Sequence, residues 1–211
     1  MIYARILVFM IGNLIFSLGI SITINMQHLG IHPWDVLSVA LFEKIGLSIG
    51  SWNIIIGILL ITVSLILDRT YVKFGTIANA ILIGMFVDFY LWLDFLPQAT
   101  HTWTDVGVIL SGIVIMGIGG GIYNGAGIGS GPRDGFMLSI ADKTGVSIGK
   151  VRIITETSVL LLGLLIGGPV FIFTFVFTFI QSPIFQFVYL KVADNLKKYE
   201  VKMNEQKSRA M

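Results

Sequence analysis

Gly30-Ile31-His32-Pro33-Trp34-Asp35 opens a segment that closes with Lys44-Ile45-Gly46-Leu47-Ser48-Ile49-Gly50, and the pattern returns 99 residues later, from Gly129-Ser130-Gly131-Pro132-Arg133-Asp134 to Lys143-Thr144-Gly145-Val146-Ser147-Ile148-Gly149. From Asn25 to Gly50, nine of 26 positions match the residue 99 positions later, where ordinary residue frequencies give about two. The chain is therefore a tandem repeat. We divide it into a first repeat, residues 1–98, a second repeat, 99–190, and a tail, 191–211. Internal repeats in membrane proteins build polar sites between their two halves.

The composition of the chain places it in a lipid bilayer. Hydrophobic residues make up 55% of the sequence, charged residues make up 12%, and the mean hydropathy is +0.88, whereas soluble domains carry about 25% charged residues. There are no cysteines, which excludes disulfides, thiolate nucleophiles and thiolate metal sites. The N-terminal apolar run lacks a small-residue cleavage site, so we expect a retained first span.

The last 21 residues concentrate positive charge. We interpret this tail as a cytosolic signal that fixes the topology, with a weak contact to anionic lipids as the alternative, and we expect no nucleic-acid binding. Its basic residues are Lys191, Lys197, Lys198, Lys202, Lys207 and Arg209.

Six apolar runs are long enough, or nearly so, to cross the roughly 30 Å of a bilayer core. Two further segments, residues 33–45 and 132–144, begin with Pro and carry Asp two positions later, which is typical of a helix start. Each has about 13 residues and would be roughly 20 Å long as a helix, which is short for a span. The six runs cover about residues 5–24, 51–67, 75–96, 104–123, 152–168 and 170–190.

The topology depends on whether the two short segments cross. If they enter and return, the chain has six spans and the halves are inverted; if they cross, it has eight spans and parallel repeats. Six spans with a cytosolic N-terminus leave 13 of the 14 Lys and Arg residues on the cytosolic side, against 11 for eight spans, so the positive-inside rule favours six. We expect an all-α membrane protein of two homologous halves, each with three spanning helices and one short Pro-initiated re-entrant helix, with both termini cytosolic. The eight-span parallel repeat remains the alternative.

The two short helices carry the candidate substrate-binding residues. In an inverted arrangement their N-termini meet near mid-membrane, which would place Asp35 and Asp134 side by side, with Trp34 and Arg133 as their unlike neighbours. The structural alternative is that each Asp only caps its own helix. The functional interpretation is that they contact a solute or coupling ion, because ionisable groups within a membrane are costly and usually serve a pathway.

Four other polar residues call for an interpretation. Asp88 lies deep in its predicted span and would be a proton carrier or a partner of Arg133, with a structural role as the alternative. Asn25 and Asn124 occupy equivalent positions before the turns and would either cap backbone or contact solute. For Glu156 we favour an i,i+4 pair with Arg152.

Glycines every four residues, at 117, 121, 125 and 129, form a stripe that favours close helix packing. A dinucleotide-binding interpretation fails because no strand precedes the glycines. His28 and His32 have a metal-ligand spacing only within a helix, which Gly30 and Pro33 oppose. We expect no metal site and no cofactor.

The runs Pro-Trp-Asp-Val-Leu (33–37), Gly-Leu-Ser-Ile-Gly (46–50), Gly-Ser-Gly-Pro-Arg-Asp-Gly (129–135) and Gly-Val-Ser-Ile-Gly (145–149) resemble the YczE/YyaS/YitT group of bacterial integral membrane proteins, above all its YczE branch. The resemblance implies a bacterial inner-membrane protein of two similar halves without a soluble enzymatic domain. After Gly167-Gly168-Pro169 that group carries further glycines, whereas this chain has Val170-Phe171-Ile172-Phe173. This difference argues against a close backbone approach at the start of the sixth span.

The leading functional hypothesis is a transporter or permease for a small molecule or ion, with a polar site at the repeat interface. Two carboxylates beside one arginine favour a cation, an amine, a zwitterion or proton coupling, because the Asp residues would cancel the positive helix N-termini that attract anions. The alternative is a non-transporting scaffold or regulatory protein, followed by a passive channel. We expect no enzyme activity, because the chain has no H-E-x-x-H motif, no Cys and no plausible Ser/His pair.

Overall fold

The computed structural model describes residues 2–93 and 95–209, and within them the prediction of an all-α fold is confirmed. The short helices begin at Pro33 and Pro132 as expected, and a glycine follows the end of each. The elements are α1 (Ile2–Asn25), η1 (Gln27–Leu29), α2 (Pro33–Ile45), α3 (Ile49–Leu67), η2 (Arg69–Tyr71), α4 (Phe74–Trp92), α5 (Thr104–Gly125), α6 (Pro132–Thr144), α7 (Ile148–Ile166) and α8 (Ile172–Arg209), where η denotes a 3-10 helix.

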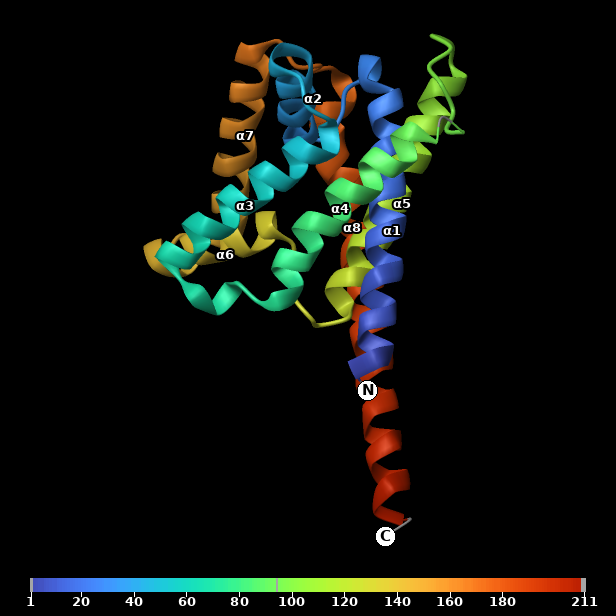
Figure 1. The fold of residues 1–211 in the computed structure, drawn as a ribbon, viewed down its shortest axis with the longest axis vertical. Helices are drawn as coiled ribbons and strands as arrows, with labels where there is room; N and C mark the ends of the chain where they lie inside the picture. Colours follow the sequence, from blue (N-terminus) through green and yellow to red (C-terminus); the bar gives the residue numbers. More distant parts are fainter. Residues whose placement is uncertain (1, 94, 210–211) are drawn as a thin grey trace.

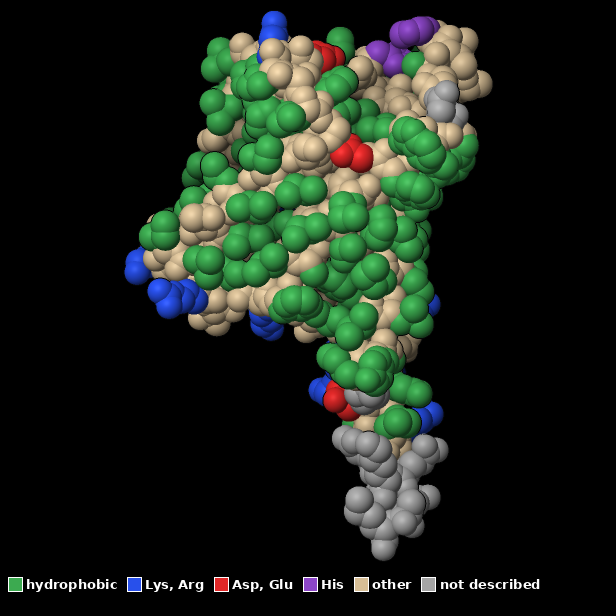
Figure 2. Space-filling model, viewed as in Figure 1, with side chains coloured by type: hydrophobic (Ala, Val, Ile, Leu, Met, Phe, Trp, Pro, Cys, Tyr) green, Lys and Arg blue, Asp and Glu red, His purple; other side chains and the backbone are tan. Residues whose placement is uncertain are grey.

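Five of the described helices, α1, α3, α4, α5 and residues 172–203 of α8, are long and apolar enough to cross a membrane. Figure 2 shows hydrophobic side chains covering most of the visible face of the body, while Lys and Arg lie at its ends and on the projecting helix. The remaining predicted span, residues 152–168, falls on α7, which has 19 residues but carries Lys150, Arg152 and Glu156 in its first half. The crossing of α7 therefore stays a prediction.

The helices form a long three-helix bundle with a lobe beside it (Figure 1). In the bundle, α5 packs against both α1 and α8, and the end of α8 projects beyond the body on the side of the N-terminus. The lobe contains α2 packed on α7 and α3 packed on α4 and α6. In Figure 1, α2 lies at the end of the body far from the N-terminus and α6 lies toward the opposite end.

Glycines allow the bundle helices to touch at backbone distance. A Cβ on Gly12 of α1 would lie 2.4 Å from the backbone nitrogen of Tyr123 in α5. The predicted packing role of the glycine stripe is confirmed for Gly117, Gly121 and Gly125, which all face α8. The fourth glycine, Gly129, instead contacts the start of α4. Such contacts fix the distance and rotation of neighbouring helices.

A second close approach joins the loop before α2 to the start of α8. Gly30 has φ +101°, and a Cβ there would lie 2.8 Å from the backbone nitrogen of Thr174. The expectation that no close approach occurs at the start of the sixth span is therefore wrong. The glycine that allows the contact, Gly30, lies in the loop before α2 and not at the start of α8. Phe171 and Ile172 therefore do not prevent the close approach.

Candidate functional site

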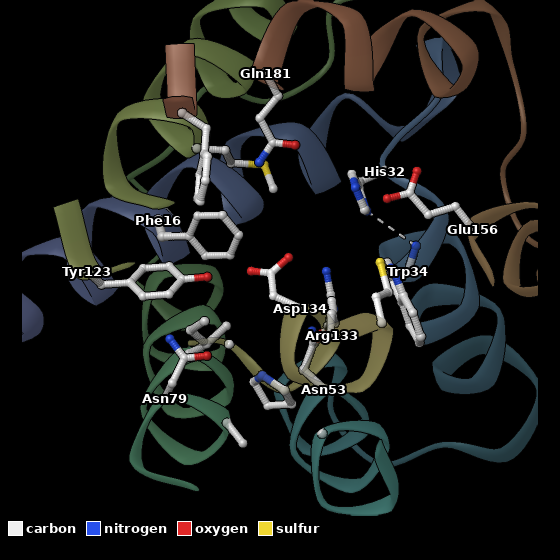
Figure 3. A pocket seen from close by; sticks show the side chains of 18 of the residues that line it. Phe16, His32, Trp34, Asn53, Asn79, Tyr123, Arg133, Asp134, Glu156 and Gln181 are labelled. Carbon is white, nitrogen blue, oxygen red and sulfur yellow. Dashed lines mark hydrogen bonds between the residues drawn. The ribbon is translucent and has the colours of Figure 1, made fainter. Parts of the chain in front are cut away.

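A cavity of about 110 Å³ is lined by side chains from each of the eight α-helices of the described residues (Figure 3). A volume of this size holds several water molecules or part of a small solute. Each helix contributes at least one side chain to the lining: Phe16 (α1), Trp34 (α2), Asn53 (α3), Asn79 (α4), Tyr123 (α5), Arg133 and Asp134 (α6), Arg152 and Glu156 (α7), and Gln181 (α8).

Arg133 is held by three groups of the first repeat. Its Nη2 donates to Asp35 Oδ1 at 3.2 Å and to Asn53 Oδ1 at 2.8 Å, and the guanidinium lies over the Trp34 ring, 5.4 Å from its centroid. The Asp35 side chain is fully buried, whereas that of Arg133 is 22% exposed. The ion pair thus joins α2 to α6, and the stacking on Trp34 adds a cation–π attraction.

The second ion-pair cluster lies between α6 and α7. Arg152 Nη2 donates to Asp134 Oδ1 at 3.1 Å, and its Nε lies 4.0 Å from Glu156 Oε1. The predicted i,i+4 pair of Arg152 and Glu156 is confirmed. Neither residue was predicted to belong to the site, although both line the cavity together with their equivalents 99 positions earlier, Asn53 and Gly57.

The structure brings together four of the predicted site residues. Trp34, Arg133 and Asp134 line the cavity, and Asp35 lies behind Arg133. The two carboxylates do not form one shared site, because each is bound by a different arginine. At the start of α2 it is His32 Nδ1, not Asp35, that accepts from the backbone N–H of Trp34 at 3.4 Å.

The other three predicted site residues are not in the cavity lining. Asn25 donates to the carbonyl oxygen of Pro97, and Asn124 donates to that of Gly120 within its own helix. Asp88 accepts from Gly50 N at 2.8 Å and from the Ser48 hydroxyl, so it caps α3 from a neighbouring helix. The hypothesis that Asp88 is a partner of Arg133 must therefore be corrected, since Arg133 pairs with Asp35.

Three buried polar atoms of residues in the cavity lining have no hydrogen-bond partner among the described residues: Trp34 Nε1, Arg152 Nε and Asn79 Oδ1. Trp34 is 3% exposed and Asn79 is not exposed. The large majority of buried side-chain polar atoms in proteins are paired, so two unpaired donors and one unpaired acceptor in one cavity leave hydrogen bonds for water or a bound molecule to complete. Trp34 was among the predicted site residues, whereas Asn79 was not.

The described side chains outside the cavity are not arranged as a metal site. In the described part of the chain no three His, Asp or Glu side chains are grouped as metal ligands. His28 lies 3.1 Å from Asp105 and its ring lies 4.6 Å from that of His101, whereas His32 belongs to the cavity.

A separate polar contact joins η2 to α6 outside the cavity. The Tyr71 hydroxyl of η2 donates to the Asp142 carboxylate of α6, and this bond raises the pKa of the Tyr71 hydroxyl.

Comparisons with known proteins identify relatives without an assigned activity. The model of a family of unknown function, DUF6198, matches residues 3–189. The chain is 39% identical to the uncharacterized membrane protein YczE of Bacillus subtilis over 75% of this chain and 73% of that protein. It is 33% identical to the uncharacterized protein YyaS of the same organism, over 76% of this chain and 80% of that protein. An uncharacterized protein of Haemophilus influenzae is 32% identical, over 78% and 74%. No solved structure matches.

Proposed function

Because the chain belongs to the DUF6198 family and is related to the membrane protein YczE, we propose that it is a transporter or permease for a small solute, with the central cavity as its site. The family carries no assigned function, so the proposal rests on the cavity itself. A scaffold or regulatory protein, which is the alternative, has no need of a charged cavity enclosed by all of its helices.

The observation that carries the proposal is the set of charges at the cavity. Arg133, Arg152, Asp134 and Glu156 line it, and Asp35 is paired just behind. Ionisable side chains inside a membrane protein are expensive and mark substrate or ion pathways. Taken as ionised, these five side chains sum to a formal charge of −1, which favours an amine, a cation or a zwitterion over an anion.

We further propose that the two halves are inverted copies and that α2 and α6 are re-entrant helices. In support, α2 and α6 have bounds 99 residues apart, as do α3 and α7, while α2 and α6 lie at opposite ends of the body in Figure 1. Equivalent residues of the two halves also line the same cavity. Six pairs of lining residues are 99 positions apart: His32/Gly131, Trp34/Arg133, Asn53/Arg152, Gly57/Glu156, Asn79/Thr178 and Ile83/Ser182.

In this proposal the cavity opens in turn to either side of the bacterial inner membrane, with both termini in the cytosol. Inverted-repeat transporters move one half against the other around a fixed midplane site. The Arg133–Asp35 bond connects the halves, so a solute that competes for Arg133 would loosen that connection. The Arg152–Asp134 bond stays within the second half and would move with it.

The test is solute flux in proteoliposomes with a panel of radiolabelled small amines and amino acids. Asp134→Asn removes a charge from the cavity lining, so we expect at least a tenfold loss of uptake with normal membrane insertion. The matched control is Asp142→Asn, the same change two turns later on α6, where the side chain is exposed and lies outside the cavity lining. If wild-type liposomes take up none of the panel faster than protein-free liposomes, the scaffold or regulatory alternative replaces transport.

A further inference from the structure

The unpaired atoms of the cavity are of two kinds and lie on two sides of it. Trp34 Nε1 is a donor without an acceptor, and Asn79 Oδ1 is an acceptor without a donor. In Figure 3, Asn79 and Tyr123 lie on one side of Asp134, while Trp34 and His32 lie on the other. A solute that satisfies both atoms must therefore offer an acceptor at one end and a donor at the other.

Three oxygen atoms converge on the side of Asn79. A Cβ on Gly131 would lie 3.0 Å from Tyr123 Oη, 3.3 Å from Asn79 Oδ1 and 3.8 Å from Asp134 Oδ2. All three oxygens therefore surround one small space that only a glycine leaves open. All three oxygens can accept a hydrogen bond, that of Tyr123 through the lone pairs of its hydroxyl and that of Asp134 as a carboxylate, and together they match the three N–H donors of a primary ammonium group.

The direction of the Asn79 amide is set by its neighbours. Its Nδ2 donates to Asn13 Oδ1 at 2.7 Å, and Asn13 Nδ2 donates to the Phe9 carbonyl at 2.7 Å. With its nitrogen engaged in this way, Asn79 presents its oxygen to the space beside Gly131. Asp134 is similarly arranged, because Arg152 occupies its Oδ1 and leaves Oδ2 toward the same space.

The opposite side of the cavity is suited to a carboxylate. Trp34 supplies an unpaired N–H, and Arg133 adds positive charge above the same ring at 5.4 Å. Arg152 Nε is also buried without a hydrogen-bond partner, although it is ion-paired with Glu156 Oε1 at 4.0 Å. Aromatic and aliphatic side chains, among them Phe16 and Phe185, complete the lining, which favours a ligand with an apolar body.

We propose that the solute is a small zwitterion with a primary ammonium group, a carboxylate and a short apolar body, as in a small amino acid. Its ammonium binds among Tyr123, Asn79 and Asp134, and its carboxylate binds Trp34 Nε1. This inference rests on the proposed function only where it treats the bound molecule as a transported solute. Binding at the cavity can be measured whether or not transport occurs.

The test compares each zwitterion with its two halves. The unfolding temperature of the purified protein is measured at increasing concentrations of L-alanine, L-valine and L-leucine. The same measurement is made with the corresponding amines that lack the carboxylate (ethylamine, isobutylamine, isopentylamine). It is also made with the corresponding acids that lack the amine (propanoate, isovalerate, isocaproate). We expect at least one zwitterion to bind about tenfold or more tightly than both of its halves, since each half loses one charge-assisted end. The N,N,N-trimethyl derivative, which has no N–H, should also bind more weakly.

Two variants locate the two ends. Trp34→Phe removes Nε1, which has no partner in the free protein, together with part of the buried ring under Arg133, so we expect a lower unfolding temperature. Binding of the zwitterion should weaken about tenfold while binding of the amine stays unchanged, which assigns the loss to the end that holds the carboxylate. Gly131→Ala places a methyl group among the three oxygens and should abolish binding of both zwitterion and amine. Gly131 has φ −60°, which alanine adopts without strain. The control is Gly149→Ala, which meets nothing within 4 Å.

The inference is overturned if no zwitterion of the panel binds, if either half binds as tightly as the whole, or if Trp34→Phe keeps full affinity. These results are separate from a failure of the proposed function. If a zwitterion binds but is never moved across proteoliposome membranes, transport is refuted and the assignment of the cavity stands. If Asp134-dependent uptake is found for a solute of another class, transport stands and the zwitterion assignment is refuted.

Discussion

The Arg133–Asp35 pair predicts an asymmetry between two single substitutions. The side chain of Asp35 is fully buried and that of Arg133 is 22% exposed. Arg133→Met would leave the Asp35 carboxylate buried without a cation, and stranding a buried charge costs about 3–5 kcal/mol. Asp35→Asn would leave Arg133 with Asn53 and the Trp34 ring, so we expect a smaller loss of about 1.5–3 kcal/mol, the value of one hydrogen bond to a charged group.

The two substitutions together should be milder than Arg133→Met alone. With Asp35 changed to Asn, no buried charge remains to be stranded, so the double variant should recover most of the stability that the single Arg133 variant loses. The free energy of unfolding would be measured by denaturant titration in lipid–detergent micelles for the wild type, both single variants and the double variant. The reasoning is refuted if Arg133→Met costs no more than Asp35→Asn, or if the double variant is as unstable as Arg133→Met.

Three further predictions concern the frame of the site. Gly12→Val would force side-chain atoms against the backbone of Tyr123 and should cost about 3 kcal/mol or more, so near-normal yield and melting temperature would contradict the packing described. Asp88→Ala removes the acceptor for the first turn of α3 and should lower the free energy of unfolding by about 0.5–2 kcal/mol without changing which solutes bind; a change in solute preference would instead place Asp88 on the pathway. The raised pKa of Tyr71, caused by its bond to Asp142, predicts a contribution to stability that is complete below the unfolded-state pKa of about 10 and is lost as pH rises through the folded-state pKa. Melting curves at alkaline pH should show this loss for the wild type and a smaller one for Tyr71→Phe, and equal losses would exclude the bond as its cause.

Several features were determined by the sequence alone, because they depend on signals that act over a few residues. Pro33 and Pro132 mark the starts of the two short helices, and Gly46 and Gly145 follow their ends. Proline at a first helical position and glycine after the last one are backbone effects that need no tertiary partner. The apolar composition likewise sufficed to predict an all-α membrane protein, and the repeat pointed to Arg133, Trp34 and both Asp residues before any contact was known.

The tertiary structure alone decided which charges pair and which polar groups reach the cavity. Asp88 illustrates the reason: a Cβ on Gly50 would lie 2.1 Å from the carbonyl oxygen of Gly84, and this contact between α3 and α4 brings Asp88 to the start of α3 and away from Arg133. The oxygens of Asn79 and Tyr123 meet for a similar reason, because α4 and α5 each pack on α1, where Asn13 bonds to Asn79 and Gly12 lies against Tyr123. Side-chain partners depend on the distance and rotation between whole helices. These are set by contacts between residues far apart in the chain, and a local sequence pattern carries no information on such contacts.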